Sequence, residues 1–157
     1  VDISAGMLDV GRKKISKRGM DNQIVLQLAD SEQLPFADGH FDAFTVAFGV
    51  RNFQNLSRGM SEMLRVLKPG GTGIIIEFSR PTTFPIKQLF TFYFKYIMPG
   101  IGKLVSKDSR AYTYLPESVD AFPAGKKFTD LMESLGYKEC RCIPLSGGIA
   151  SIYIGVK

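Results

Sequence analysis

The stretch RVLKPGGTGIIIEFS, Arg65 to Ser79, decides the fold because a helical pattern ends in it and a strand pattern begins. Before it, apolar residues recur at helical spacing from Leu56 to Leu67. After it, Thr72 to Phe78 is a short apolar run of the kind found in buried strands. We therefore expect an amphipathic helix closed by Lys68-Pro69-Gly70-Gly71 and followed directly by a strand of a sheet.

The glycines of this stretch raise the question of a phosphate-binding loop. Such a loop lies between a strand and the N-terminus of a helix, where free amides hold the anion. Here the order is reversed, with the helix first and the strand second. We therefore interpret Gly70 and Gly71 as a helix stop and a tight turn, and expect any cofactor site at the C-terminal ends of the parallel strands.

Further helices and strands alternate on both sides of this stretch. Phe41 to Phe48 is apolar on both faces, as a central parallel strand would be. The last two strands are joined by Leu-Ser-Gly-Gly, which predicts an antiparallel hairpin at one edge of the sheet. The expected helices are Ser4 to Lys17 and Phe128 to Leu135, and the other expected strands are Ile24 to Leu28, Tyr137 to Pro144 and Ile149 to Val156. The sequence thus predicts one α/β domain over residues 1–157, with a doubly wound, mostly parallel sheet.

Composition limits the classes of function. The net charge of +5 comes from scattered basic residues, with no dense run that would follow a nucleic acid backbone, so we expect no nucleic acid partner. Cys140 and Cys142 are too close in sequence for an ordinary disulfide, and with His40 as the only histidine we expect no metal. No apolar run is long enough to span a bilayer, and the first residues do not resemble a signal peptide, which favours the cytoplasm.

Polar residues follow three of the expected strands at the same edge of the sheet. Asp2 and Asp30 each follow a strand position, and the segment from Ala47 to Asn52 ends the third. An aspartate at a strand end can accept both hydroxyls of a ribose, and one two loops further on can accept from an adenine amine. The alternative is that each aspartate only caps the helix or turn that follows it.

Four motifs together resemble a known family. Arg65 to Gly71, followed by Ile76-Glu77-Phe78-Ser79, is similar to the second signature of the ubiquinone/menaquinone biosynthesis C-methyltransferases, R-V-[aliphatic]-K-P-G-G ending in E-x-S. These are class I S-adenosyl-L-methionine-dependent methyltransferases. The other three motifs are Val1 to Ser4 with Met7-Leu8, Ala29 to Phe36, and Ala47 to Asn52. The resemblance covers essentially the whole chain.

The resemblance implies roles for four residues toward S-adenosyl-L-methionine. Asp2 would hold the ribose of the cofactor, Asp30 and Ser31 would contact its adenine, and Ala47 would line the methionine end.

It also implies methyl transfer to a ring carbon of a polyprenylated quinol. Arg51 and Asn52 would face this substrate, Arg51 stabilising the developing phenolate and Asn52 orienting the oxygen. No metal is needed, and no residue is identified as the base. Alternatively, Arg51 and Asn52 cap the next helix.

The chain departs from the family at its beginning. Class I methyltransferases open with a strand and a glycine-rich loop of the E-x-G-x-G type, whereas this chain begins at Val1-Asp2, a position after both. We therefore expect an incomplete class I sheet, truncated at its N-terminus, which by itself binds the cofactor weakly and is inactive. A non-catalytic interaction module is the alternative from another class.

An aromatic segment within residues 84–120 is expected to form a substrate lid or a lipid-facing helix. Its apolar residues at helical spacing are Ile86, Leu89, Phe90, Tyr93, Phe94 and Ile97, with Phe92 and Met98 beside them. The lysines that would approach lipid headgroups at the inner face of the membrane are Lys87, Lys95, Lys103 and Lys107. Alternatively, this helix packs on the sheet or against a second copy of the chain in a homodimer.

The residues do not separate naphthoquinol from benzoquinol substrates. The segments FPIKQLF and AYTYLPESV are more similar to members of the menaquinone pathway, which favours demethylmenaquinol, with a ubiquinone-pathway benzoquinol or another small molecule as the alternative. A methyltransferase for nucleic acid amines would show an Asn/Asp-Pro-Pro-aromatic loop after the strand that here ends in Ala-Phe-Gly-Val-Arg-Asn, and that loop is absent.

Overall fold

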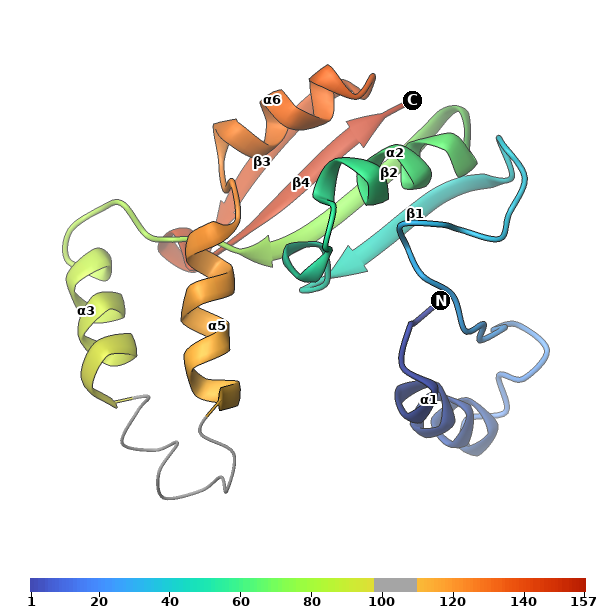
Figure 1. Ribbon diagram of the computed structural model, residues 1–157, viewed down its shortest axis with the longest axis horizontal. Coiled ribbons are helices and arrows are strands. Elements are labelled where there is room, and N and C mark those ends of the chain that lie inside the picture. Colours follow the sequence, from blue (N-terminus) through green and yellow to red (C-terminus); the bar gives the residue numbers. More distant parts are fainter. Residues whose placement is uncertain (98–109) are drawn as a thin grey trace.

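The protein is built on a four-stranded sheet with helices, and the computed structural model describes residues 1–97 and 110–157 (Figure 1). The strands lie in the order β1-β2-β4-β3, with β1 parallel to β2 and β4 antiparallel to both β2 and β3. Their bounds are β1 Phe41–Ala47, β2 Leu67–Phe78, β3 Lys138–Leu145 and β4 Ala150–Val156. The predicted α/β class and the antiparallel C-terminal hairpin at a sheet edge are confirmed. The described sheet is mixed, with one parallel and two antiparallel pairs, and not mostly parallel as predicted.

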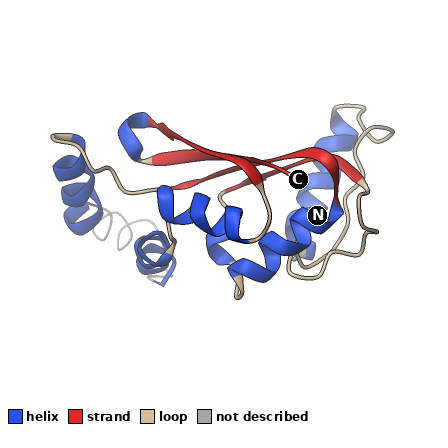
Figure 2. Ribbon diagram, turned by 90° about the horizontal axis from the view of Figure 1, so that it is seen from above, coloured by secondary structure: helices blue, strands red, loops and turns tan. Residues whose placement is uncertain are grey.

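Helices precede, connect and flank the strands. Figure 2 shows α2 and α6 on the same side of the sheet. The helices are α1 Ala5–Lys17, α2 Leu56–Val66, α3 Ile86–Phe92, α5 Arg110–Ala121 and α6 Lys126–Ser134. Short helical turns are η1 Val50–Asn52, η2 Tyr93–Ile97, which continues α3, and η3 Ser146–Gly148 within the β3–β4 hairpin. The predicted helices at both ends of the chain are confirmed, and Ser4 caps α1 by accepting a hydrogen bond from the amide of Met7.

The core lies between the sheet and helices α2 and α6. The phenol ring of Tyr153 on β4 is fully buried and meets the ring of Phe128 on α6 edge to face, with 4.7 Å between ring centroids. Its hydroxyl accepts a hydrogen bond from the Gly125 amide at 2.8 Å, so burial leaves no polar group unpaired there. The apolar stripe predicted for α2 supplies Met60, Met63 and Val66 to the same core.

The glycine pair after α2 does not end the helix, so that part of the prediction is wrong. The helix ends at Val66 because Leu67 is already extended, and β2 begins at Leu67 itself. Gly70 has φ 79° and lies in a bulge, since the pairing between β1 and β2 shifts at this point. A Cβ on Gly71 would lie 2.9 Å from two backbone oxygens, so the pair makes a tight, crowded turn within the strand.

Two expected strands differ in the structure. Ile24–Leu28 is not a strand: only Leu28 pairs, through a single parallel bridge to Asp2, and Val25 is 86% exposed. A ladder needs a neighbour of similar length, and this segment finds none among the described residues. The strand β1 is at the edge of the described sheet and half exposed, not central and buried on both faces.

An ion-pair network anchors the loop before β1 to helix α2. Glu62 accepts hydrogen bonds from Arg65 and from the buried Leu34 amide at 2.9 Å. Arg65 also donates to the carbonyl oxygens of Leu34 and Phe36 and pairs with Asp38. The hydrogen bond from Arg65 holds the pKa of the Glu62 carboxyl below its usual value. The loop that carries Asp30 is thereby attached to a core helix.

The helix of the aromatic segment stands to one side of the sheet (Figures 1 and 2). No residue of α3 is buried, so the alternative that this helix packs on the sheet is wrong. Its base contacts the hairpin turn, where a Cβ on Gly147 would meet the side chain of Ile86. Of the residues predicted for this segment, Met98, Lys103 and Lys107 lie outside the described residues, as do the side chains of Phe94 and Lys95.

Candidate functional site

A cavity of about 570 Å³ lies at the C-terminal end of β1. It is lined by five of the six residues predicted for the site, namely Asp2, Asp30, Ser31, Ala47 and Asn52. These residues come from four separate parts of the chain: the N-terminus, the loop after Leu28, the last position of β1, and the turn η1. The structure therefore brings the predicted cofactor residues together, in the size range of small-molecule sites.

Asp2 and Asp30 are placed by a short backbone pairing. The Asp2 amide donates to the Gln27 carbonyl oxygen at 3.2 Å, and the Ala29 amide donates to the Asp2 carbonyl oxygen at 3.1 Å. In each carboxylate Oδ1 accepts an amide two residues on, from Ser4 and Glu32 respectively, at 2.8 Å. The alternative that each aspartate caps the turn after it therefore holds for one carboxylate oxygen, Oδ1, of each. The second oxygen has no hydrogen bond among the described residues and is available to a ligand.

Arg51 does not line this cavity. Its guanidinium is 10% exposed and pairs with the fully buried Glu77 carboxylate, with 2.8 Å between Nη1 and Oε1. The same nitrogen donates to the Phe48 carbonyl oxygen, and the guanidinium lies 5.3 Å from the centre of the Phe78 ring. Arg51 thus holds the turn against β2, and its buried Nε is left without an acceptor among the described residues.

Asn52 is held from the opposite side by helix α5. Its Oδ1 accepts a hydrogen bond from the Tyr114 hydroxyl at 2.8 Å, which leaves the amide nitrogen free to donate elsewhere. The alternative that Arg51 and Asn52 cap the next helix is wrong, because Asn55 caps α2 by accepting from the Arg58 amide.

The backbone between β1 and η1 is strained. Phe48 has φ 56°, a left-handed conformation that is uncommon for a residue with a side chain. Its amide donates to the Ile76 carbonyl oxygen at 2.8 Å, and its ring lies 4.5 Å from that of Phe78. These contacts with β2 hold the turn in a backbone conformation that costs about 1–3 kcal/mol of folding free energy. Strain of this size is often found at functional sites.

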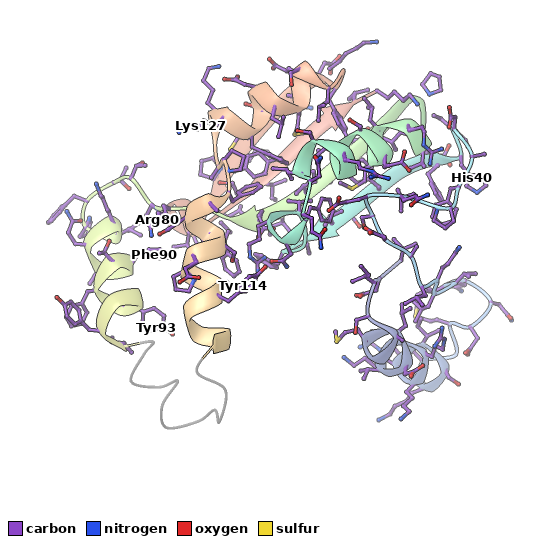
Figure 3. The ribbon with its side chains drawn as sticks, in the orientation of Figure 1. His40, Arg80, Phe90, Tyr93, Tyr114 and Lys127 are labelled. Carbon is purple, nitrogen blue, oxygen red and sulfur yellow. The ribbon has the colours of Figure 1, made fainter. Side chains whose placement is uncertain are left out.

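The cavity is acidic. Asp2, Asp30 and Glu32 line it, and no lysine or arginine is among its lining residues in the described chain. Because like charges concentrate the field in a concave site, the arrangement favours a ligand with positive charge. His40 is remote from this chemistry: it precedes the opposite end of β1, where its exposed ring meets Phe41 at 4.6 Å between centroids (Figure 3).

Three residues that shape the site were assigned no role from the sequence. Glu77 belongs to the E-x-S motif, and that motif was the signal available in the sequence. In the structure its buried carboxylate lies beside the turn that carries Arg51. Glu32 accepts from the Asn55 amide at 3.0 Å and so joins the Asp30 loop to α2. Tyr114 lies 62 positions from Asn52, and no local pattern links the two.

Comparison with known proteins gives a family and close relatives. The sequence model of the ubiE/COQ5 methyltransferase family matches residues 1–157. The chain is 46% identical over 156 residues to the demethylmenaquinone methyltransferase of Bacteroides fragilis, covering 99% of this chain and 64% of that protein. It is 45% identical to a ubiquinone/menaquinone biosynthesis C-methyltransferase of Geobacter sulfurreducens, covering all of this chain and 61% of the relative. The chain thus spans less than two thirds of the length of these relatives.

Solved structures support the fold. A methyltransferase from Thermotoga maritima, described as a possible histamine N-methyltransferase, matches with a TM-score of 0.66 at 18% identity, covering 99% of this chain and 70% of that one. A methyltransferase from Aquifex aeolicus matches with a TM-score of 0.59 at 17% identity, covering 98% and 65%. At these identities the likeness concerns the fold alone, and it agrees with the predicted Rossmann-like methyltransferase sheet.

Proposed function

Because the chain belongs to the ubiE/COQ5 methyltransferase family, we propose that the whole protein transfers a methyl group from S-adenosyl-L-methionine to a ring carbon of a polyprenylated quinol. The observation that carries the proposal is the cavity that unites Asp2, Asp30, Ser31, Ala47 and Asn52. Demethylmenaquinol is the favoured substrate, since the Bacteroides fragilis relative is a demethylmenaquinone methyltransferase. A benzoquinol is the alternative.

The chemistry of the cavity suits this cofactor. S-adenosyl-L-methionine carries a sulfonium and an ammonium group, and among the described residues the lining contributes three carboxylates and no lysine or arginine. We propose that the free oxygen of Asp2 binds the ribose hydroxyls and that Asp30 and Ser31 meet the adenine. Ala47 would lie beside the methionine end. The cofactor supplies the methyl group, and these residues orient it.

Arg51 and Asn52 have complementary roles toward the quinol in this proposal. The Asn52 amide nitrogen, left free by the Tyr114 contact, would donate to the ring oxygen whose proton is lost. Arg51 is paired with Glu77 and does not line the cavity, so in this proposal it acts on the quinol by holding the turn that carries Asn52. The carbon beside the phenolate oxygen is thereby made nucleophilic toward the methyl group.

A methyl-transfer assay tests the function. The 157-residue chain is joined to the part of the Bacteroides fragilis relative that it does not match, and this chimera is given labelled cofactor with either quinol. We expect transfer to demethylmenaquinol, and we expect Asn52→Ala to lower kcat by about a hundredfold, as loss of a donor to a developing oxyanion does. No transfer to either quinol, while the intact relative is active in the same assay, would reject the proposal.

The aromatic helix is proposed to touch the membrane that holds the substrate, as a peripheral contact at its inner face. Helix α3 with η2 exposes Leu89 (65%), Phe92 (55%) and Tyr96 (60%), with Lys87 at its base. No described helix is both long and apolar enough to cross a membrane, so the contact would be interfacial.

Vesicle binding tests this contact. Burying Leu89 and Phe92 contributes at least about 1.5 kcal/mol each, so the change to aspartate at both is expected to weaken sedimentation with anionic phospholipid vesicles more than tenfold. The control is Val25→Asp, which changes an 86% exposed apolar side chain on a separate loop. Equal loss in both variants, or no loss in either, would argue against α3 as the contact and leave a second copy of the chain as its partner.

A further inference from the structure

A larger cavity, of about 780 Å³, shares no lining residue with the candidate site and has no role in the chemistry described above. It is bounded by Ser79 at the end of β2, by Ser151 on β4, and by the junction of α5 with α6. Its apolar wall consists of Val119, Phe122, Ala124, Cys142 and Pro144.

This cavity adjoins a second one of about 540 Å³. Arg80 and Thr82 line both of them, so the two spaces meet at these residues. The far wall of the second cavity includes Phe90 of α3 and Pro116 of α5. Figure 3 shows Arg80 and Phe90 in the region between α3 and α5. We call the joined space the trough; it leads from the sheet to the exposed aromatic helix.

Helix α5 connects the trough to the candidate site. Tyr114, near its start, holds Asn52 of the site, whereas Pro116 and Val119 line the trough. At 1.5 Å of rise per residue, the five positions from Tyr114 to Val119 span about 7.5 Å. Tyr114 and these two residues lie on different faces of α5, because two and five positions correspond to about 200° and 140° of helical rotation. A tail attached to a ring beside Asn52 therefore has to cross α5 to enter the trough.

Four polar side chains of the trough, those of Ser79, Ser151, Arg80 and Asp120, bond to one another or to the backbone. The Ser79 hydroxyl donates to the Gly148 carbonyl oxygen at 2.8 Å and lies 2.9 Å from the Ser151 hydroxyl. The Arg80 guanidinium is paired with Asp120, which offsets its charge. Lys127 lies where α6 borders the cavity. A polar ligand would gain little from groups already bonded, whereas a hydrocarbon would bury its surface against the apolar wall.

We infer that the trough holds the polyprenyl tail of the quinol. The identity of the ligand in this inference rests on the proposed function. The location of the tail rests on the two cavities and on helix α5, which borders them. The ring would lie beside Asn52, and the tail would cross α5 and continue through the trough toward α3, the helix with the exposed apolar residues.

Photo-crosslinking of the 157-residue chain tests the inference. The probe is a naphthoquinone whose prenyl tail ends in a diazirine, and the adducts are mapped by peptide mass spectrometry. We expect most adducts within residues 119–125 and 142–151. Ala124→Trp, which fills the larger cavity, and Thr82→Trp, at the exposed junction, are each expected to lower this yield at least fivefold. The matched control is Ala5→Trp on α1, with far-ultraviolet circular dichroism to check folding of every variant.

Adducts spread over the whole chain, or a yield that both folded tryptophan variants leave unchanged, would overturn the inference. The methyl-transfer assay separates it from the proposed function. Trough adducts without methyl transfer in the chimera would retain the tail site and reject the function. Methyl transfer with tail adducts elsewhere would retain the function and reject the trough.

Discussion

Replacing Glu77 by alanine is expected to lower the free energy of unfolding by about 3 to 5 kcal/mol, because it leaves the Arg51 guanidinium buried without its counter-charge. The carboxylate is fully buried and also accepts hydrogen bonds from the backbone amides of Arg51 and Phe78, at 3.2 and 2.9 Å. Those two donors would lose their acceptor as well. Since small domains have a total of about 5–15 kcal/mol, this single change would remove a large fraction of the stability.

Urea unfolding followed by circular dichroism measures this effect. The double variant Glu77→Leu with Arg51→Met removes both charges, and we expect it to recover most of the loss, since an apolar pair of similar volume often replaces a buried ion pair without cost. The control is Asp42→Asn, which removes the exposed pair between Lys68 and Asp42 and should leave the unfolding midpoint unchanged. If Glu77→Ala unfolded at the wild-type midpoint, the pair could not be what holds the turn at Phe48 to β2.

The features predicted from the sequence were those set by local pattern. Helix α2 follows from apolar residues at a 3.6-residue period, and the hairpin of β3 and β4 follows from two strand patterns with a short glycine-containing link. The end of α2 was misplaced for a physical reason. Gly70 adopts φ 79° inside a bulge of β2, and the bulge is set by pairing with β1, which a helix-stop pattern does not contain.

Strand Ile24–Leu28 was wrong for a related reason. Its branched apolar residues favour extended backbone, but a strand is a property of a pair, and here only Asp2 pairs with Leu28. The apolar content of β1 likewise indicated a buried central position, whereas β1 is paired on one side only in the described sheet. The composition of a segment shows how apolar it is, but it does not show how many strands pair with it.

The resemblance named six site residues, and five of them line one cavity in the structure, while their roles stay predictions. Ala47 ends β1, whereas Asp2 and Asp30 are brought to the same cavity by the single bridge between Asp2 and Leu28. The partners of Arg51 and Asn52 could not be predicted from local sequence pattern, because Glu77 and Tyr114 are 26 and 62 positions away along the chain. A charge toward the substrate was predicted for Arg51, and a role for it in the reaction stays a prediction.

Asp2→Asn is expected to weaken binding of S-adenosylhomocysteine by about ten- to a hundredfold in the chimera. The change keeps the shape and the acceptor that holds the Ser4 amide, but it removes the charge that would strengthen hydrogen bonds from the ribose hydroxyls. Hydrogen bonds to a charged group contribute about 1.5–3 kcal/mol, which corresponds to this range of affinity. Calorimetric titration gives the dissociation constant directly. Asp9→Asn, on α1 and paired with Arg12 at the surface, is the control and should bind as the wild type does.

A double-mutant cycle with a modified ligand then assigns the contact to the ribose. The 2′-deoxy analogue lacks one of the two hydroxyls, so the wild-type chimera should bind it more weakly than the normal ligand. If Asp2 is the acceptor, the Asp2→Asn variant should show little further loss with the analogue, because the interaction has already been weakened from the protein side. Asp30, proposed to meet the adenine, provides the contrast: in Asp30→Asn the penalty for the missing hydroxyl should persist in full. Additive losses for Asp2→Asn and the analogue would place the ribose elsewhere in the cavity and leave Asp2 as a residue that only orders the turn before α1.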